Sequence, residues 1–246
     1  KSIVRKKFLS EHTTAKTSAI GLRAYYEGVT GMHPEHFIEL HFLKEVLPGY
    51  LWIFPLPNGQ VNVGVGVISE RIRRKKINLR QQMLDAITNN PQIAPRFANA
   101  KLVGGIQGWG LPLAMHRQPL LGDNFVLVGD AASLVDPFSG EGIGNALYSG
   151  MLAAAAIKDA VAQNDFSGAF FSRAYDDVLY RRLGDEFRIS AVLQKLCNYP
   201  RLFNLVVNKA YKSESLRNTI SSMFTDMDLR AQLGKPSFYL KILMNK

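Results

Sequence analysis

Residues 126–145 constrain the fold more than any other part of the chain. A short apolar run ends in Gly129-Asp130, a loop with proline and glycines follows, and a helix rich in alanine and glycine begins near residue 141. The run at 126–128 predicts a buried parallel strand, and open α/β sheets bind ligands just beyond the carboxyl ends of such strands, where Asp130 lies. The glycines leave the start of the helix open to an anionic or electron-rich ligand.

This segment resembles the second flavin-contacting motif of FAD-dependent oxidoreductases with the para-hydroxybenzoate hydroxylase fold. The resemblance implies that Asp130 hydrogen-bonds a ribose or ribitol hydroxyl of FAD, and that the backbone of residues 140–145 lies beside the pyrophosphate and the flavin ring. The cofactor-binding residues that it implies are Arg5, Gly129, Asp130, Pro137, Gly140, Gly142, Ile143, Gly144 and Asn145. The alternative is a generic strand-turn-helix unit without a ligand, because a motif becomes a site only in its structural context.

The fold that carries this motif normally begins with a strand, a Gly-x-Gly-x-x-Gly turn and a helix that hold the FAD diphosphate. The chain has no such fingerprint, and residues 104–108, the nearest approach, have the wrong spacing. Residues 2–5 resemble the end of another family motif, Asp-Gly-x-x-Ser-x-Val-Arg. On this resemblance we expect residues 1–8 to be a remnant of the FAD domain, with its amino-terminal nucleotide-binding part missing. Such a fragment is expected to bind FAD weakly or not at all, and to be inactive alone.

Asn58-Gly59 separates two strand-like runs, at residues 50–55 and 61–68. An Asn-Gly pair between such runs is the strongest short hairpin signal in a sequence. A two-residue turn pairs Pro57 with Gln60 and thereby fixes the register of the two strands.

That predicted register decides which side chains share a face. Six side chains lie on one face: Tyr50, Trp52, Phe54, Val63, Val65 and Val67. The other face carries Gly64 and Gly66, where a ring or another backbone could approach closely.

Residues 48–55 match the pattern Pro-x-x-Tyr-x-Trp-x-Phe-Pro, which resembles the substrate-cavity motif of the geranylgeranyl reductase family. Residues 62–66 are also similar to that family. The resemblance implies an apolar wall that binds an isoprenoid chain, with the substrate-binding residues Tyr50, Trp52, Phe54, Pro55, Val63 and Val65. The alternative is that these aromatic residues fill a core, since aromatic stripes usually pack inside.

The remaining periodicity predicts strands in the first half of the chain and helices in the last third. Strands are expected at 19–29, 36–43 and 102–113, and helices at 79–89, 141–163 and 170–196, with shorter helices near Pro200 and a tail ending around Pro236. The fold class is mixed α+β and α/β: an antiparallel substrate-binding sheet, a remnant of an FAD-binding α/β domain, and a carboxyl-terminal helical region. The expected domains are residues 1–8 (FAD-domain remnant), 9–115 (substrate sheet), 116–165 (FAD-domain strand, motif loop and helix) and 166–246 (helical region).

The chain carries a formal net charge of +10 and one cysteine, Cys197, which is expected to be a small buried residue. A single cysteine excludes an internal disulfide and favours a reducing, cytoplasmic compartment. No apolar run reaches the roughly 18 residues that span a bilayer, so we expect peripheral membrane contact at most. No nucleic-acid motif accompanies the basic residues, and the cluster at 71–76 is expected to be a solvated loop. We expect no nucleic-acid partner and no metal site.

These resemblances together imply a flavin-dependent oxidoreductase similar to geranylgeranyl reductases. Reduced FAD would deliver a hydride to a carbon–carbon double bond of an isoprenoid group, while the protein orients the substrate and excludes water. Two alternatives stay open: a flavin monooxygenase or halogenase of the same fold, and a module that only binds apolar ligands. The sequence assigns no catalytic residue, proton donor or electron donor.

Overall fold

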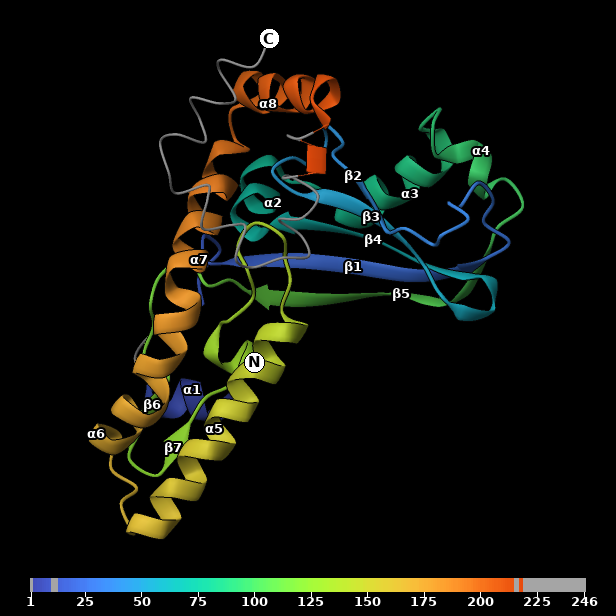
Figure 1. Ribbon diagram of the computed structural model, residues 1–246. Coiled ribbons are helices and arrows are strands. Elements are labelled where there is room, and N and C mark those ends of the chain that lie inside the picture. Colours follow the sequence, from blue (N-terminus) through green and yellow to red (C-terminus); the bar gives the residue numbers. More distant parts are fainter. Residues whose placement is uncertain (1, 10–12, 215–216, 219–246) are drawn as a thin grey trace. The chain divides into compact units, whose positions relative to one another are not determined.

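The computed structural model of the protein describes residues 2–9, 13–214 and 217–218 (Figure 1). The chain divides into two compact units. Residues 13–111 form one, which we call the sheet unit. Residues 1–12 and 112–246 form the other, which we call the motif unit because it contains the segment 126–145. Residues 116–165 and 166–246, which were expected to be two domains, both belong to the motif unit.

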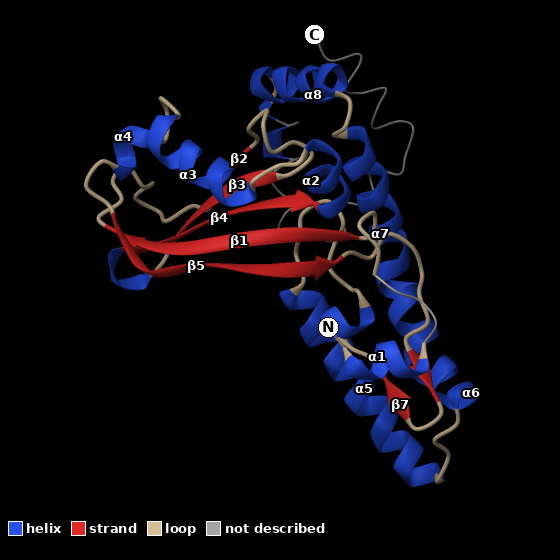
Figure 2. Ribbon diagram, turned by 180° about the vertical axis from the view of Figure 1, so that it is seen from behind, coloured by secondary structure: helices blue, strands red, loops and turns tan. Residues whose placement is uncertain are grey.

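The sheet unit is built on a five-stranded sheet with the strand order β2-β3-β4-β1-β5. Its strands are β1 (Ser18–Glu27), β2 (Glu39–His41), β3 (Tyr50–Pro55), β4 (Gln60–Ile68) and β5 (Lys101–Pro112). Its helices are α2 (Ser69–Lys75), α3 (Leu79–Asn89) and α4 (Ala94–Phe97). The pairs β1–β4, β3–β4 and β2–β3 are antiparallel, which confirms the expected antiparallel sheet. Helices α3 and α4 lie along one face of the sheet (Figure 2).

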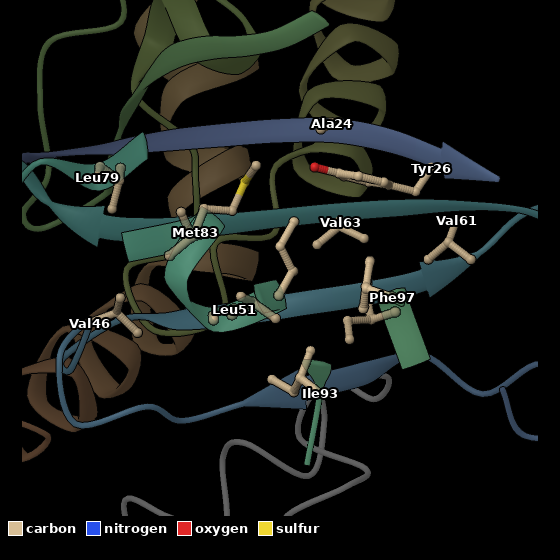
Figure 3. Packing of buried hydrophobic residues seen from close by; sticks show 14 of the residues in the cluster. Ala24, Tyr26, Val46, Leu51, Val61, Val63, Leu79, Met83, Ile93 and Phe97 are labelled. Atoms are coloured by element: carbon tan, nitrogen blue, oxygen red, sulfur yellow. The ribbon is translucent and has the colours of Figure 1, made fainter. Parts of the chain in front are cut away.

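That face carries the core of the sheet unit (Figure 3). Leu51 and Ile53 on β3, and Val63 and Val65 on β4, are fully buried there. They belong to one cluster with Met83 and other apolar residues of α3, the amphipathic helix that the sequence predicted. Side chains at the intervening strand positions point to the opposite face of the sheet.

The hairpin between β3 and β4 differs from the prediction by one residue of register. Its loop has three residues, Pro57–Gly59, and the Leu56 N–H closes it by donating to the carbonyl of Gln60 (2.8 Å). Proline explains the difference. The predicted two-residue turn requires an N–H donor at position 57, and proline has none.

A shift of one residue moves each side chain to the other face relative to its neighbour strand. Trp52 therefore lies opposite Gly64, and Tyr50 lies opposite Gly66. Val63 and Val65, predicted to share a face with the aromatic residues, belong instead to the core on the other side. The predicted register was wrong, and the aromatic residues share their face with the glycines.

Two further segments of the sheet unit differ from expectation. Strand β2 has only three residues, and His36 before it has a positive φ of 56°, which interrupts an extended backbone. Residues 71–76 were expected as a loop, but residues 71–75 belong to helix α2, and Lys76 after it has the left-handed conformation (φ 51°) that ends the helix. Arginine and lysine are good helix formers, so a charged run is compatible with either structure. The last four side chains of the cluster are exposed, as expected.

Arg96 fastens the segment before β2 to that strand. Its guanidinium donates to both carboxylate oxygens of Glu39 (2.6 and 2.8 Å), and its Nε donates to the carbonyl of Thr30 (3.0 Å). His41 contacts the same carboxylate at 3.1 Å. The hydrogen bonds from Arg96, more than any other contact, lower the pKa of Glu39.

Replacing Arg96 with methionine is expected to lower the free energy of unfolding by about 2 kcal/mol at neutral pH, because the mostly buried Glu39 carboxylate loses its bidentate partner. Since the pair lowers the pKa of Glu39, its stabilisation is complete above the ordinary carboxyl pKa of about 4.3. It is lost as the pH falls through the lower folded-state value. Thermal melts across this pH range measure the effect, with the exposed Lys101 changed to methionine as the control. A stability difference that does not shrink in acid would contradict the ion pair.

The motif unit is mostly helical. Its elements are α1 (Ile3–Phe8), β6 (Leu121–Gly122), β7 (Phe125–Val126), α5 (Ile143–Gln163), α6 (Gly168–Phe171), α7 (Asp177–Leu196) and α8 (Pro200–Lys212). Its core gathers the small residues of α5 against large side chains of the helices that follow, with Phe171, Tyr175 and Leu179 almost fully buried. Among the residues that the structure describes, no helix is long and apolar enough to cross a membrane.

The apolar run before Gly129 pairs differently from the prediction. β7 pairs with β6 in the antiparallel direction. Just beyond this pairing, the Leu127 N–H donates a hydrogen bond to the carbonyl of Leu120 (2.6 Å). A parallel strand was wrong for these residues, because the pairing partner in the described chain is the preceding arm of a hairpin. A parallel bridge does occur nearby, between Leu113 and Val135.

The helix expected at 170–196 is present with one irregularity. A π-helical segment, Ser172–Asp176, joins α6 to α7. Cys197 follows α7, and burial raises the pKa of its thiol to about 11, which keeps it protonated and unreactive. Helix α8 begins at Pro200, where a break was expected. The tail predicted around Pro236 lies outside the described residues.

Candidate substrate face and flavin-contacting loop

Trp52 occupies the face of the sheet opposite the core. Its indole lies against Gly64 on the neighbouring strand, and side-chain carbons at Gly66 and Gly21 would stand 3.6 and 3.9 Å from its ring. The missing side chains let the ring lie close to the backbone. The indole N–H donates to Asn62 Oδ1 (3.1 Å). A ring or another backbone was expected to approach these glycines, and the ring of the protein's own Trp52 does so.

Trp52 stands within a row of four aromatic rings. Successive ring centroids are 6.1 Å apart for Phe42 and Tyr50, 6.1 Å for Tyr50 and Trp52, and 6.2 Å for Trp52 and Phe54. We call these four side chains the aromatic row. Phe42 is 39% exposed and the other three are half-buried, so the row is an accessible apolar surface rather than part of the core. Phe42 was not predicted, although it lies one residue beyond the β2 ladder.

β5 adds another ring to this face that sequence reasoning missed. Arg23, which pairs with Gly64, donates to Gln107 Oε1 on β5 (2.6 Å), so these two side chains lie on the face of the aromatic row. Trp109 follows Gln107 by two residues and therefore shares its face. Its side chain is 66% exposed. The period-two signal was present in the sequence but was obscured by the many glycines of this strand.

In the motif unit, Asp136 organises the loop that precedes α5. Its side chain is buried, and Oδ1 accepts hydrogen bonds from the Phe138 N–H (3.0 Å), the Ser139 N–H (2.7 Å) and the Ser139 hydroxyl (2.8 Å). Its backbone N–H donates to the carbonyl of Glu141 (2.7 Å), and its carbonyl accepts from the Gly140 N–H (3.0 Å). The loop is thus closed on itself around one carboxylate. Sequence reasoning assigned no role to Asp136, although Asp is a common first residue of such turns.

Gly129 allows the turn before this loop to meet α5. It has a positive φ of 52°, and a side-chain carbon there would stand 3.0 Å from the Cβ of Ala146. Its N–H donates to Ser149 Oγ (3.1 Å). Glycine is required here both by the backbone conformation and by the close approach of the helix.

Three other predicted cofactor residues are also buried. Arg5 Nη1 donates to the carbonyl of Ala131 (3.0 Å), and Asn145 Nδ2 donates to the carbonyl of Leu134 (2.9 Å). Pro137 is buried in the same loop. These side chains support the loop from inside, and direct contact of Arg5, Pro137 and Asn145 with FAD stays a prediction.

The remaining predicted residues form what we call the exposed rim, of which Gly142 is half-buried and the others are exposed: Asp130, Gly140, Gly142, Ile143 and Gly144. The structure brings Asp130 and Gly142 close together. A side-chain carbon on Gly142 would stand 3.9 Å from Asp130 Oδ1 and 3.2 Å from Val135 Cγ2, so the carboxylate lies beside the start of α5. The Asp130 side chain is open to solvent, yet neighbouring atoms desolvate it enough to raise its pKa.

Glu141 determines what the start of α5 can bind. Its Oε1 accepts from the Gly144 N–H (2.7 Å), so a carboxylate already balances the positive end of the helix. A second anion at this place would be repelled. The exposed rim therefore fits hydroxyl groups, which Asp130 can accept from, and ring carbonyls, which backbone N–H groups can donate to. The ribitol and flavin ring of FAD carry such groups, and contact of residues 140–145 with the pyrophosphate stays a prediction.

The sheet unit is also similar in sequence to known reductases. Residues 19–107 match the family model of the geranylgeranyl reductase catalytic domain. A digeranylgeranylglycerophospholipid reductase of Thermoplasma volcanium is 36% identical over 127 residues, which cover 51% of this chain and 31% of that protein. The predicted resemblance to geranylgeranyl reductases is confirmed. A menaquinone reductase of Mycobacterium tuberculosis is 32% identical over 193 residues, which cover 74% of this chain and 43% of that protein. The chain thus spans less than half the length of these two relatives.

Solved structures extend the similarity to most of the chain. A geranylgeranyl bacteriochlorophyll reductase-like protein of Thermoplasma acidophilum has a TM-score of 0.74 at 22% identity, covering 91% of this chain and 58% of that one. A halogenase in complex with phloroglucinol and FAD has a TM-score of 0.60 at 15% identity, covering 94% and 50%. At sequence identities this low, the two similarities establish the fold alone. They confirm the predicted fold class.

Proposed function

We propose that the protein is a flavin-dependent oxidoreductase that reduces a carbon–carbon double bond of an isoprenoid group. The observation that carries this proposal is the aromatic row, which lies opposite the core and inside the residues that match the reductase catalytic domain. An isoprenoid chain offers no charge and no strong hydrogen-bonding group, so burial of apolar surface has to supply its binding energy. An accessible row of rings is suited to that task.

The cofactor in this proposal is FAD. Asp130 would accept a hydrogen bond from a ribitol or ribose hydroxyl, and the backbone of the exposed rim would lie beside the flavin. When bound, FAD supplies the hydride chemistry, while the protein orients the reactants and excludes water. Asp136 and Arg5 would act as positioning residues, because they hold the rim through backbone groups of the loop.

A halogenase or monooxygenase of the same fold is the second candidate, since a halogenase shares this fold. The aromatic row favours the reductase. Most of its surface is ring carbon; of its two polar groups, the Trp52 indole N–H already donates to Asn62, and the other is the Tyr50 hydroxyl. A phenolic substrate would need a partner for its hydroxyl, whereas an isoprenoid chain needs none.

We also propose a cytoplasmic location with peripheral membrane contact. The single cysteine is typical of a reducing compartment, and a formal net charge of +10 attracts anionic lipid surfaces. Such attraction weakens with salt, because exposed charges are screened over about 10 Å at 0.1 M ionic strength.

Replacing Trp52 with alanine in a flavin-loaded preparation tests the proposed substrate face. Loss of a half-buried indole removes about 1.5–3 kcal/mol of apolar contact, so reduction of a geranylgeranyl substrate at low concentration should slow by roughly 10- to 100-fold. The flavin absorbance should not change, because Trp52 is not part of the exposed rim. Trp52→Phe keeps a ring in the row and should lose less activity.

Thermal melts of the same Trp52 variants separate a substrate contact from a core role. A tryptophan that filled the core would cost roughly 3–5 kcal/mol when truncated. A half-buried Trp52 should cost clearly less. Normal turnover by the folded fraction, together with a core-sized loss of stability, would defeat the proposed role of the aromatic row.

A further inference from the structure

We propose that helix α8 is the part of the protein that contacts an anionic lipid surface. This inference rests on the proposed peripheral membrane contact and names the element responsible for it. Between Glu186 and Glu214 the sequence contains no acidic residue. It contains five cations there: Arg188, Lys195, Arg201, Lys209 and Lys212. The charge of this region is therefore complementary to anionic headgroups, which attract each cation held near them.

Helix α8 also presents apolar side chains to solvent. Phe203, Val207 and Tyr211 are spaced by four residues and follow one face of the helix. Val207 is 46% exposed and Tyr211 is 82% exposed. A tyrosine with an apolar body and a polar tip suits the boundary between lipid and water. An exposed apolar face of this kind beside cations is typical of helices that lie in the membrane interface.

The cations are placed beside this apolar face. Arg201 and Lys212 follow a neighbouring face of α8 together with the neutral Asn208, and all three are exposed. With the apolar face inserted about 5–10 Å into the headgroup region, these cations can reach the phosphates. The helix has 13 residues and is therefore about 20 Å long, shorter than the roughly 30 Å hydrocarbon core. It is suited to lie along the surface.

Helix α2 has similar charge without the apolar face. Arg73, Arg74 and Lys75 are exposed at its end, but Ile72 packs against the core of the sheet unit. No large apolar side chain of α2, which the structure describes in full, is exposed. Helix α2 is therefore a charge-matched control for α8.

The test is flotation of the protein with vesicles of phosphatidylcholine, alone or mixed with phosphatidylglycerol. Changing Arg201 and Lys212 together to glutamine should weaken binding to the mixed vesicles at least about tenfold. The same change of Arg73 and Lys75 removes equal charge and should have an effect below about twofold. Val207→Asp should weaken binding as strongly as the α8 pair, because it places a charge in the apolar face. Binding of the unchanged protein should require the anionic lipid and decline with salt.

Flotation needs neither flavin nor turnover, so its outcome is independent of the proposed reductase activity. Equal losses in the two double variants would assign binding to total charge and overturn the role of α8. Loss in the α2 variant alone, or no flotation of the unchanged protein, would overturn it as well. The proposal would also be overturned if the protein did not bind vesicles but bound a DNA duplex, and the Arg201 and Lys212 changes abolished that DNA binding. Thermal melts check that each variant is folded.

Discussion

Replacing Gly64 with alanine is expected to destabilise the sheet unit by about 3 kcal/mol or more. A methyl group at this position would overlap the carbonyl oxygen of Leu22 and the ring of Trp52. The ring can shift, but the carbonyl belongs to the β1–β4 ladder and cannot move without breaking it. We expect the thermal midpoint of the sheet unit to fall by about 10 °C or more.

Gly66 provides the matched control for this substitution. It lies two residues further along the same strand and on the same face, but a side-chain carbon there would be at an ordinary contact distance of 3.6 Å from Trp52. Gly66→Ala should change the free energy of unfolding by less than about 1 kcal/mol. Equal losses of stability at the two positions would show that glycine is required by the strand backbone, rather than by the close contact of Trp52 and the Leu22 carbonyl with residue 64.

Replacing Asp136 with alanine is expected to cost about 3 kcal/mol or more in the motif unit. The substitution leaves the Ser139 N–H and hydroxyl and the Phe138 N–H without their acceptor, and each such group costs about 1–3 kcal/mol when buried. Because the loop then loses its closure, a flavin-loaded preparation should also release FAD. Chemical denaturation and flavin fluorescence measure the two effects on the same sample.

Two variants show whether Asp136 acts through the loop. Asp136→Asn keeps Oδ1 as an acceptor and should retain most of the stability. Asp130→Ala should weaken FAD binding by about 1–3 kcal/mol, because it removes an acceptor on the exposed rim, while leaving the thermal midpoint nearly unchanged. FAD binding that is normal in a folded Asp130→Ala variant would remove this carboxylate from the site. An Asp136→Ala variant as stable as the parent would show that the Asp136 carboxylate does not hold the loop closed.

The elements of the sheet unit could be predicted because alternation and helical spacing are local properties of the sequence. β3 and α3 have the bounds that their periodicity indicates. The register between β3 and β4 could not be read in the same way, because it depends on one missing N–H at Pro57. A single proline thus moved Val63 and Val65 from the predicted substrate face into the core.

The candidate flavin loop shows a different limit. Its motif marks Asp130 and the glycines, but Asp130 and Asp136 are the same residue type within one short segment. Burial separates them, because Asp130 is exposed while Asp136 is surrounded by donors of its own loop. Burial depends on how the chain folds back on itself. For this reason, neither the burial of Asp136 nor the exposure of Trp109 on β5 follows from the local spacing of residues.

The aromatic row has a consequence for a chain that contains several double bonds. Ring contacts have little directional preference along an isoprenoid, and the indole N–H is already held by Asn62. A chain bound as proposed would be fixed in depth but free to slide lengthwise, because each isoprene unit meets the same surface. Its stopping point along the row would then be set by its polar end.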